Sequence, residues 1–164
     1  MQKKSLCADD LLREKIEQYS PMVYRLAFSM VKSKSDADDI HQEVFIRYII
    51  SSPTFESENH EKAWLIRVTT NLSKNWWKTA WKRKVISLSE YKEQAQESSI
   101  EEGITLIEMV KTLPQKYRVV IHLFYYEEMS ITEIAKVLDM KEATVRTQLT
   151  RARKRLGELL KEDI

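Results

Sequence analysis

The sequence predicts an all-α protein built from two small helical domains that a flexible linker joins. Three observations support this fold class. The 164 residues include only two glycines and three prolines, which suits long helices better than the turns of a sheet protein. Apolar residues recur at helical spacing through most of the chain. Between residues 86 and 103 this periodicity stops, so we expect one domain at 9–85, a linker at 86–103 and a second domain at 104–164.

The first domain is predicted to begin with three helices. Residues 9–19 form the first. Ser20-Pro21 predicts the start of a second helix, because serine caps helices and proline suits the first helical position. The third helix spans residues 36–50. Its buried side is expected to include Ile40, Val44, Ile46, Arg47 and Tyr48.

Acidic and amide side chains crowd the first half of this third helix. They are Asp36, Asp38, Asp39, Gln42 and Glu43. Acids early in a helix favour the positive end of its dipole, which explains some of them. Two functional alternatives stay open, namely a carboxylate site for a cation such as Mg²⁺ and an acidic docking face for a basic partner.

A long helix is predicted from Glu61 to about Lys84, with Leu65, Val68, Leu72 and Trp76 as its core line. Between Arg67 and Lys84 this segment has six basic residues and no acid. Cations interleaved with aromatic rings suit single-stranded nucleic acid, because cations follow the backbone and rings stack on bases. All four tryptophans lie here. We expect Trp64 to be a core residue, whereas Trp77 and Trp81 fit a core role and a base-stacking role equally.

The second domain contains a stretch that predicts two helices with a tight turn between them. Ser130 is a good N-cap, and Glu133 three residues later completes a capping box. Asp139 stands at the turn, where glycine is common. The following helix has one apolar stripe and a basic opposite face. That face carries Arg146, Thr147, Thr150, Arg151, Lys154 and Arg155.

This arrangement is typical of a helix-turn-helix that enters the DNA major groove. Arginine offers a planar fork of donors to guanine edges and to phosphates. The alternative interpretation is an amphipathic helix whose charged face is only solvated. The capped helix before it, and the scarcity of acid between Ala143 and Gly157, favour the DNA-binding interpretation.

Composition excludes several functional classes. Cys7 is the single cysteine, so the sequence predicts neither an internal disulfide nor a cysteine-based zinc site. No apolar run approaches the roughly 20 residues that span a bilayer, and we expect a cytoplasmic protein that is not itself a membrane protein. His41, His60 and His122 are isolated from serine and cysteine, so we expect no enzyme, no cofactor and no metal.

Taken together, the two halves resemble the sigma-70 family of RNA polymerase sigma factors, of the small extracytoplasmic-function (ECF) type. The segment 38–45, DDIHQEVF, resembles region 2.2 of that family, and 63–72, AWLIRVTTNL, resembles regions 2.3 and 2.4. The segment 113–118, LPQKYR, and the helix-turn-helix resemble region 4. The sequence departs from the family pattern at Asn75 and Trp77 and at Asp139 and Lys141.

The resemblance implies a role for each matching residue. Contacts with the clamp of the polymerase largest subunit would come from Asp38, Asp39, Gln42, Glu43 and Phe45. Contacts with the −10 element would come from Asn71, Lys74, Asn75, Trp76, Trp77 and Lys78. Contacts with the −35 element would come from Thr144, Arg146, Thr147, Thr150, Arg151 and Arg153.

The resemblance also implies the partners. These are the RNA polymerase core, including the flap of its second subunit, promoter DNA, and an anti-sigma factor that masks these surfaces. The chain would direct promoter recognition, DNA opening and transcription initiation, while polymerase supplies the chemistry. Three alternatives compete with it. They are a helix-turn-helix regulator that does not dock on polymerase, a carboxylate-metal nuclease, and an all-α interaction module without a nucleic-acid role.

Overall fold

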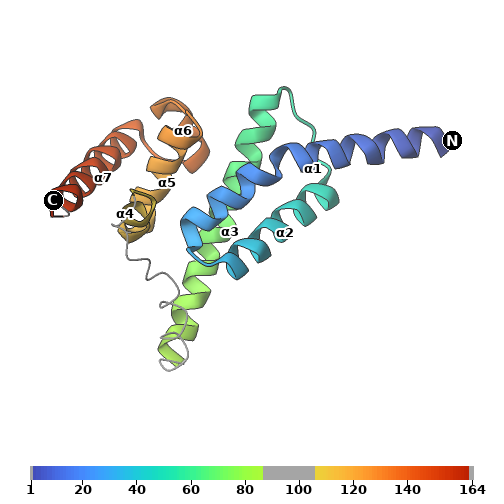
Figure 1. Ribbon diagram of the computed structural model, residues 1–164. Coiled ribbons are helices and arrows are strands. Elements are labelled where there is room, and N and C mark those ends of the chain that lie inside the picture. Colours follow the sequence, from blue (N-terminus) through green and yellow to red (C-terminus); the bar gives the residue numbers. More distant parts are fainter. Residues whose placement is uncertain (1, 87–105, 163–164) are drawn as a thin grey trace. The chain divides into compact units, whose positions relative to one another are not determined.

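The computed structural model describes residues 2–86 and 106–162, and within them the secondary structure is helical (Figure 1). The all-α prediction is therefore confirmed. The chain divides into two compact units, Met1–Leu72 and Ser73–Ile164. Residues 87–105 lie outside the described residues, and most of the predicted linker falls there. The domain boundaries at residues 85 and 104 stay predictions.

Helix α1 spans Gln2–Val31 without interruption, and Pro21 lies inside it. The prediction of a new helix at Ser20-Pro21 was therefore wrong. Proline inside a helix removes one backbone hydrogen bond and crowds the preceding turn. Here Tyr19, Met22 and Val23 are buried on either side of Pro21, so one continuous apolar face offsets that cost. The helix changes direction along its length (Figure 1), as proline-containing helices commonly do.

Helix α2, Lys34–Ser51, begins at Ser33, whose side chain accepts a hydrogen bond from the backbone N–H of Asp36. It packs beside α1 (Figure 1). His41 joins the two helices, because its Nε2 lies 2.6 Å from Oγ of Ser20 and its ring meets that of Tyr24 on α1 edge-on. Burial lowers the pKa of His41, and the negative charge of Asp38 opposes that shift.

Helix α3 spans Glu58–Ile86. Trp64 packs against Tyr48 and Phe55, with ring centroids 5.9 and 6.0 Å away, which supports the predicted packing role. The predicted core line was only partly right. Leu65 is fully buried, but the other three predicted residues are half-buried. The positions buried after Leu65 are Ile66, Thr69, Thr70 and Ser73.

The polar members of this buried face satisfy their hydroxyl groups within the helix. Oγ1 of Thr69 donates to the carbonyl of Leu65 at 2.7 Å, and Oγ1 of Thr70 donates to that of Arg67 at 3.0 Å. A buried hydroxyl costs little once it is hydrogen-bonded. At the start of α3, the Glu61 carboxylate lies 3.5 Å from Nζ of Lys15 on α1, which ties these two helices together.

The second unit includes the end of α3 from Ser73 onward, and then α4 (Leu106–Thr112), α5 (Gln115–Ile121) and the π-helical turn η2 (His122–Tyr126). Arg118 of α5 is only 2% exposed, and its guanidinium donates to the carbonyl of Leu113 at 2.5 Å. Burial lowers the pKa of Arg118 to about 10. The side chain therefore fixes the turn between α4 and α5 from inside the core.

Helices α6 (Ile131–Leu138) and α7 (Glu142–Glu162) form the predicted helix-turn-helix. The backbone N–H of Glu133 donates to Oγ of Ser130 at 3.1 Å, as the capping pattern predicted. Asp139 ends α6 in the left-handed conformation, with φ 53° and ψ 54°. The apolar stripe of α7 is buried. It includes Val145, Leu149 and Ala152.

Left-handed residues other than glycine recur in this chain. They are Lys32, Ser52, Glu128 and Asp139, with φ between 41° and 62°. The first two directly follow α1 and α2, and Asp139 caps α6. Such residues are strained because their Cβ crowds the neighbouring carbonyl, and helices usually place glycine there.

Candidate nucleic-acid interface and acidic face

The basic face of α7 is open to solvent. All six residues predicted to contact the −35 element are exposed, opposite the buried stripe. The hydroxyls of Thr147 and Thr150 donate to the carbonyls of Ala143 and Arg146, at 2.9 Å each. Arg146 lies 3.4 Å from the carboxylate of Glu142 in an exposed ion pair, which contributes little to stability and can rearrange. This face can therefore contact the DNA major groove without any rearrangement of the α7 backbone.

Arg153 differs from the other five, because it is attached to η2. Its Nε donates to Oη of Tyr125 at 2.5 Å. Its guanidinium lies 5.3 Å from the ring centroid of Phe124 and 5.4 Å from that of Tyr125. Sequence reasoning missed Tyr125, which is 56% exposed, and no sequence signal links residues 28 positions apart. Arg153 thus holds α7 against η2, and its predicted DNA contact remains a prediction.

The predicted −10 residues lie on the second half of α3. Asn71, Lys74, Asn75 and Lys78 are exposed, and their spacing places them on one stripe of the helix. Trp76 is half-buried. The side chains of Trp77 and Trp81 lie outside the described residues, so the choice between a core role and a base-stacking role stays open for both. The described part of this stripe combines amide groups with cations, which suits contact with bases and phosphates.

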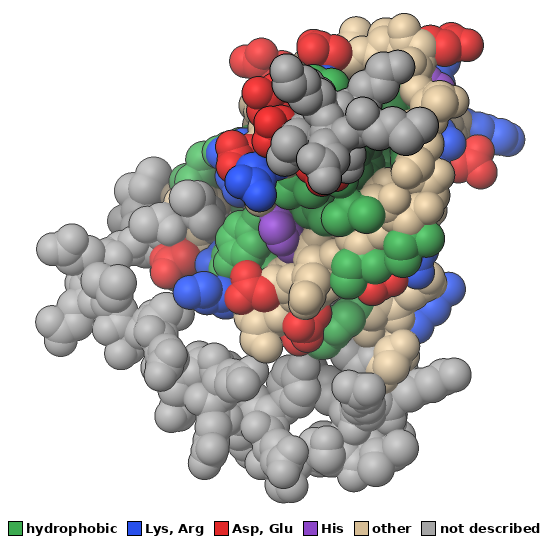
Figure 2. All heavy atoms as spheres, turned by 90° about the vertical axis from the view of Figure 1, so that its right-hand side faces the viewer, with side chains coloured by type: hydrophobic (Ala, Val, Ile, Leu, Met, Phe, Trp, Pro, Cys, Tyr) green, Lys and Arg blue, Asp and Glu red, His purple; other side chains and the backbone are tan. Residues whose placement is uncertain are grey.

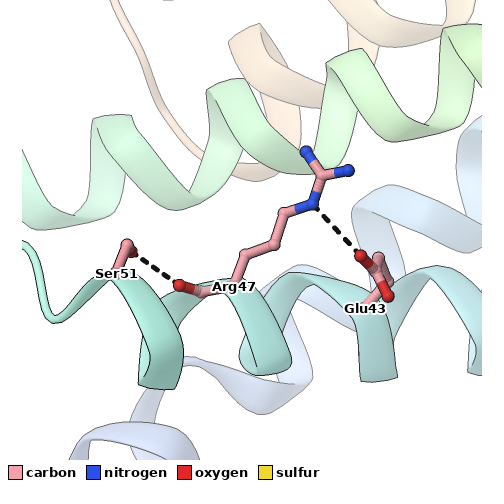
Figure 3. A network of polar contacts seen from close by, with 3 residues as sticks. All are labelled: Glu43, Arg47 and Ser51. Carbon is pink, nitrogen blue, oxygen red and sulfur yellow. Dashed lines mark hydrogen bonds and ion pairs between the residues drawn. The ribbon is translucent and has the colours of Figure 1, made fainter.

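The acidic face of α2 is also open. Asp38, Asp39 and Gln42 are exposed, and Glu43 is half-buried. The Glu43 carboxylate accepts from Nε of Arg47 at 3.2 Å, while Oγ of Ser51 donates to the Arg47 carbonyl at 2.6 Å (Figure 3). The Glu43 carboxylate of this face is therefore paired with a cation of its own helix.

Phe45 lies beneath this face rather than on it. The side chain is 6% exposed and meets the rings of His41 and Tyr48 edge-on, with centroids 5.0 and 6.4 Å away. Packing is its visible role in this structure. A direct contact between Phe45 and a partner, as predicted from the resemblance, remains a prediction.

One side of α2 exposes more apolar surface than the sequence predicted. Ile46 was expected on the buried side but is 40% exposed, and Arg47 is exposed as well. Ile49 and Ile50 are 46% and 79% exposed. Helical spacing places these three isoleucines on one stripe, which was the signal to notice. Figure 2 shows hydrophobic side chains reaching the surface among acidic ones.

Two further searches concern metals and membranes. Among the side chains that the structure describes, no three of His, Cys, Asp or Glu come together as a metal site would require. No helix in the same ranges is both long enough and apolar enough to cross a bilayer.

Two family models match the chain. "Sigma-70 region 2" matches residues 16–83, which include the acidic face and the exposed stripe of α3. "Sigma-70, region 4" matches residues 104–156, which include the helix-turn-helix. The two matches fall on the regions that carry the predicted sites.

Whole-chain relatives agree with these matches. RNA polymerase sigma factor SigV of Bacillus subtilis is 30% identical over 165 residues, covering 99% of each chain. ECF RNA polymerase sigma factor SigW of the same organism is 28% identical, covering 93% of this chain and 90% of its own.

Two solved structures share the fold at 21% identity. One is the sigma factor RpoE of Bartonella quintana in complex with the anti-sigma factor NepR, with a TM-score of 0.68 over 93% of this chain and 98% of the other. The second is CnrH in complex with the cytosolic domain of CnrY, with a TM-score of 0.69 over 95% and 91%. With its fold, its two sigma regions in order and a relative that matches end to end, the chain belongs to the sigma-70 family of RNA polymerase sigma factors, in the ECF group.

Proposed function

We propose that this chain binds the RNA polymerase core and directs promoter recognition, DNA opening and transcription initiation. The observation that carries the proposal is the pairing of a sigma region 2 match at residues 16–83 with a sigma region 4 match at 104–156, each containing a described cationic stripe that is exposed. Recognition divided between two modules gains selectivity, because binding of one raises the effective concentration of the other. The chain itself performs no chemical step.

The acidic face of α2 is the proposed contact with the polymerase clamp. Asp38, Asp39, Gln42 and Glu43 form it, with Phe45 holding α2 in position from beneath. Asp39 is exposed, and releasing Glu43 costs only an exposed i,i+4 ion pair with Arg47. A basic surface on polymerase would therefore find carboxylates that are already accessible.

Charge reversal tests this contact. Asp39→Lys with Glu43→Lys should greatly reduce co-purification with core polymerase, while circular dichroism shows the same helical content. The matched control is Asp9→Lys with Asp10→Lys, two exposed acids on α1 of the same unit. Equal co-purification of both double variants and the wild type would contradict the assignment.

The two cationic stripes are the proposed DNA contacts. On α3, Asn71, Lys74, Asn75 and Lys78, together with Trp76 and Trp77, would hold the opened strand of the −10 element. On α7, the −35 element would contact six exposed residues, of which Arg146 and Arg151 are the arginines proposed to read guanine. The six are Thr144, Arg146, Thr147, Thr150, Arg151 and Arg153.

Run-off transcription tests the function directly. Core polymerase on a genomic library should start new transcripts only when the chain is present. Arg146→Ala and Arg151→Ala should each weaken contact with the upstream element by about 1–3 kcal/mol if they read bases. A footprint unchanged in the upstream region would contradict their role. Magnesium-dependent DNA cleavage that Asp39→Ala abolishes would instead favour the nuclease alternative.

An anti-sigma factor is the further proposed partner, and the cytoplasm is the proposed location. Both solved relatives named above are bound to an inhibitor of that kind or to a cytosolic domain of a second protein. In this chain the exposed stripes of α3 and α7 are the surfaces that such a partner would have to cover. An inhibitor that blocks run-off transcription should also protect Lys74 and Arg151 from chemical modification.

A further inference from the structure

Beyond the predicted −35 residues, α7 carries a cationic hollow against α5. The hollow has a volume of about 360 Å³ and is lined by Tyr117, Arg151, Lys154, Arg155 and Glu158. The guanidinium of Arg155 lies 5.6 Å from the ring centroid of Tyr117, and Nζ of Lys116 lies 5.1 Å from the same centroid. Three cations thus line the hollow, against the single carboxylate of Glu158, and a fourth, Lys116, lies near the same ring.

This arrangement is more ordered than a row of surface lysines. The ring of Tyr117 is 6% exposed and belongs to the core, so it gives Arg155 a fixed platform. A guanidinium placed on an aromatic face loses less freedom when it binds an anion, and its fork of donors matches a phosphate. Lys154 and Arg151, both exposed, lie on the same side of α7.

The length of α7 indicates which anion occupies the hollow. Its 21 residues span ~31 Å, whereas the major groove is about 12 Å wide. A helix whose first half reads bases must therefore pass the sugar-phosphate backbone with its second half. Arg155 lies nine residues beyond Arg146, or ~13 Å along the axis, which exceeds the width of the groove, so we expect it near the edge when Arg146 reads a base.

We propose that this hollow holds a phosphate of the DNA backbone flanking the −35 element, with Lys154 and Arg155 as its principal ligands. The inference rests on the proposed function and deepens it. A phosphate contact fixes the position of the helix on DNA but carries no sequence information. Arg151 could then contact either a base or the phosphate, because it belongs to the predicted −35 residues and also lines the hollow.

The test uses holoenzyme and a 50-base-pair duplex that carries a promoter selected by run-off transcription. Lys154→Gln with Arg155→Gln should weaken binding roughly tenfold or more at 0.1 M salt. It should also lower the slope of log affinity against log salt by about 0.9, the contribution of the single phosphate that the hollow neutralises. Preference for the promoter over a duplex with a scrambled upstream element should not change.

Matched variants separate this role from a structural one. Arg155→Lys keeps the charge and should retain most of the salt slope. Lys161→Gln removes an exposed cation of the same helix outside the hollow and should behave as wild type. Neutral methylphosphonates placed one at a time along the duplex should reveal a position that weakens the wild type but not the double variant.

Each outcome bears on a different statement. A double variant with the salt slope of the wild type would overturn the phosphate assignment while leaving the proposed function intact. If the slope stays unchanged but binding to core polymerase weakens, the hollow takes acidic protein side chains, and the assignment is again wrong. If wild-type holoenzyme binds no promoter, the proposed function itself fails, and the assignment fails with it.

Discussion

Asp139 at the turn of the helix-turn-helix should limit the stability of the second unit in two separable ways. Its left-handed backbone costs an ordinary residue about 1–2 kcal/mol, and aspartate somewhat less. Its negative charge lies at the negative end of α6, where such a charge costs about 0.3–1 kcal/mol. The turn itself is held by backbone bonds, including Met140 N–H to the Ala135 carbonyl at 2.8 Å.

Three substitutions separate these effects. Asp139→Asn removes the charge but tolerates the backbone, so it should stabilise by about 0.3–1 kcal/mol. Asp139→Gly removes both costs and should be the most stable of the series. Asp139→Val also removes the charge, but it places a β-branched residue in left-handed backbone, and this added strain should make it the least stable of the series. The expected order of stability is Gly, Asn, Asp, Val.

Thermal unfolding followed by circular dichroism measures the series. A change of 1 kcal/mol should move the midpoint of the second unit by about 4–8 °C. If the valine variant is as stable as the wild type, the left-handed turn is not needed in solution and the reasoning fails.

Three other predictions concern single residues. Gly157 lies inside α7, and a Cβ there would meet nothing within 4 Å. Gly157→Ala should therefore raise the free energy of unfolding by about 1 kcal/mol, measured by urea titration. A loss of stability would contradict this. Arg118→Met should cost about 1–3 kcal/mol, because the buried carbonyl of Leu113 loses its charged donor, and an unchanged urea midpoint would refute that. Because the folded pKa of His41 is lowered, its contribution to stability is present above the ordinary pKa near 6.5 and is lost as pH falls toward the folded value. His41→Gln should therefore lose less stability than the wild type as pH falls from about 7 to 5. The raised pKa of Asp36 has the opposite effect, since it adds stability as pH falls toward about 4.

The sequence predicted the elements whose signals are local. Ser130 caps α6 through its hydroxyl group, as the sequence predicted, because capping depends on residues three positions apart. Exposure of the α7 arginines followed from helical spacing alone. These features need no knowledge of what packs against what.

Features that depend on tertiary packing were missed or misplaced. Pro21 was read as a helix start because its local preference is clear, yet burial of its neighbours keeps α1 continuous. Thr69 and Thr70 were absent from the expected core because a hydropathy pattern ignores hydroxyls that bond to their own helix. The link from Arg153 to Tyr125 joins positions 28 apart, which no periodicity can find.

The left-handed residues at positions 32, 52, 128 and 139 have a practical consequence. Each stands at a separate place in the chain, so the effects of glycine or asparagine there should add nearly independently. A graded set of variants would then span a wide range of thermal tolerance while the surfaces proposed to meet polymerase and promoter stay as they are. Such a set would let the lifetime of the unbound factor be varied as an experimental parameter.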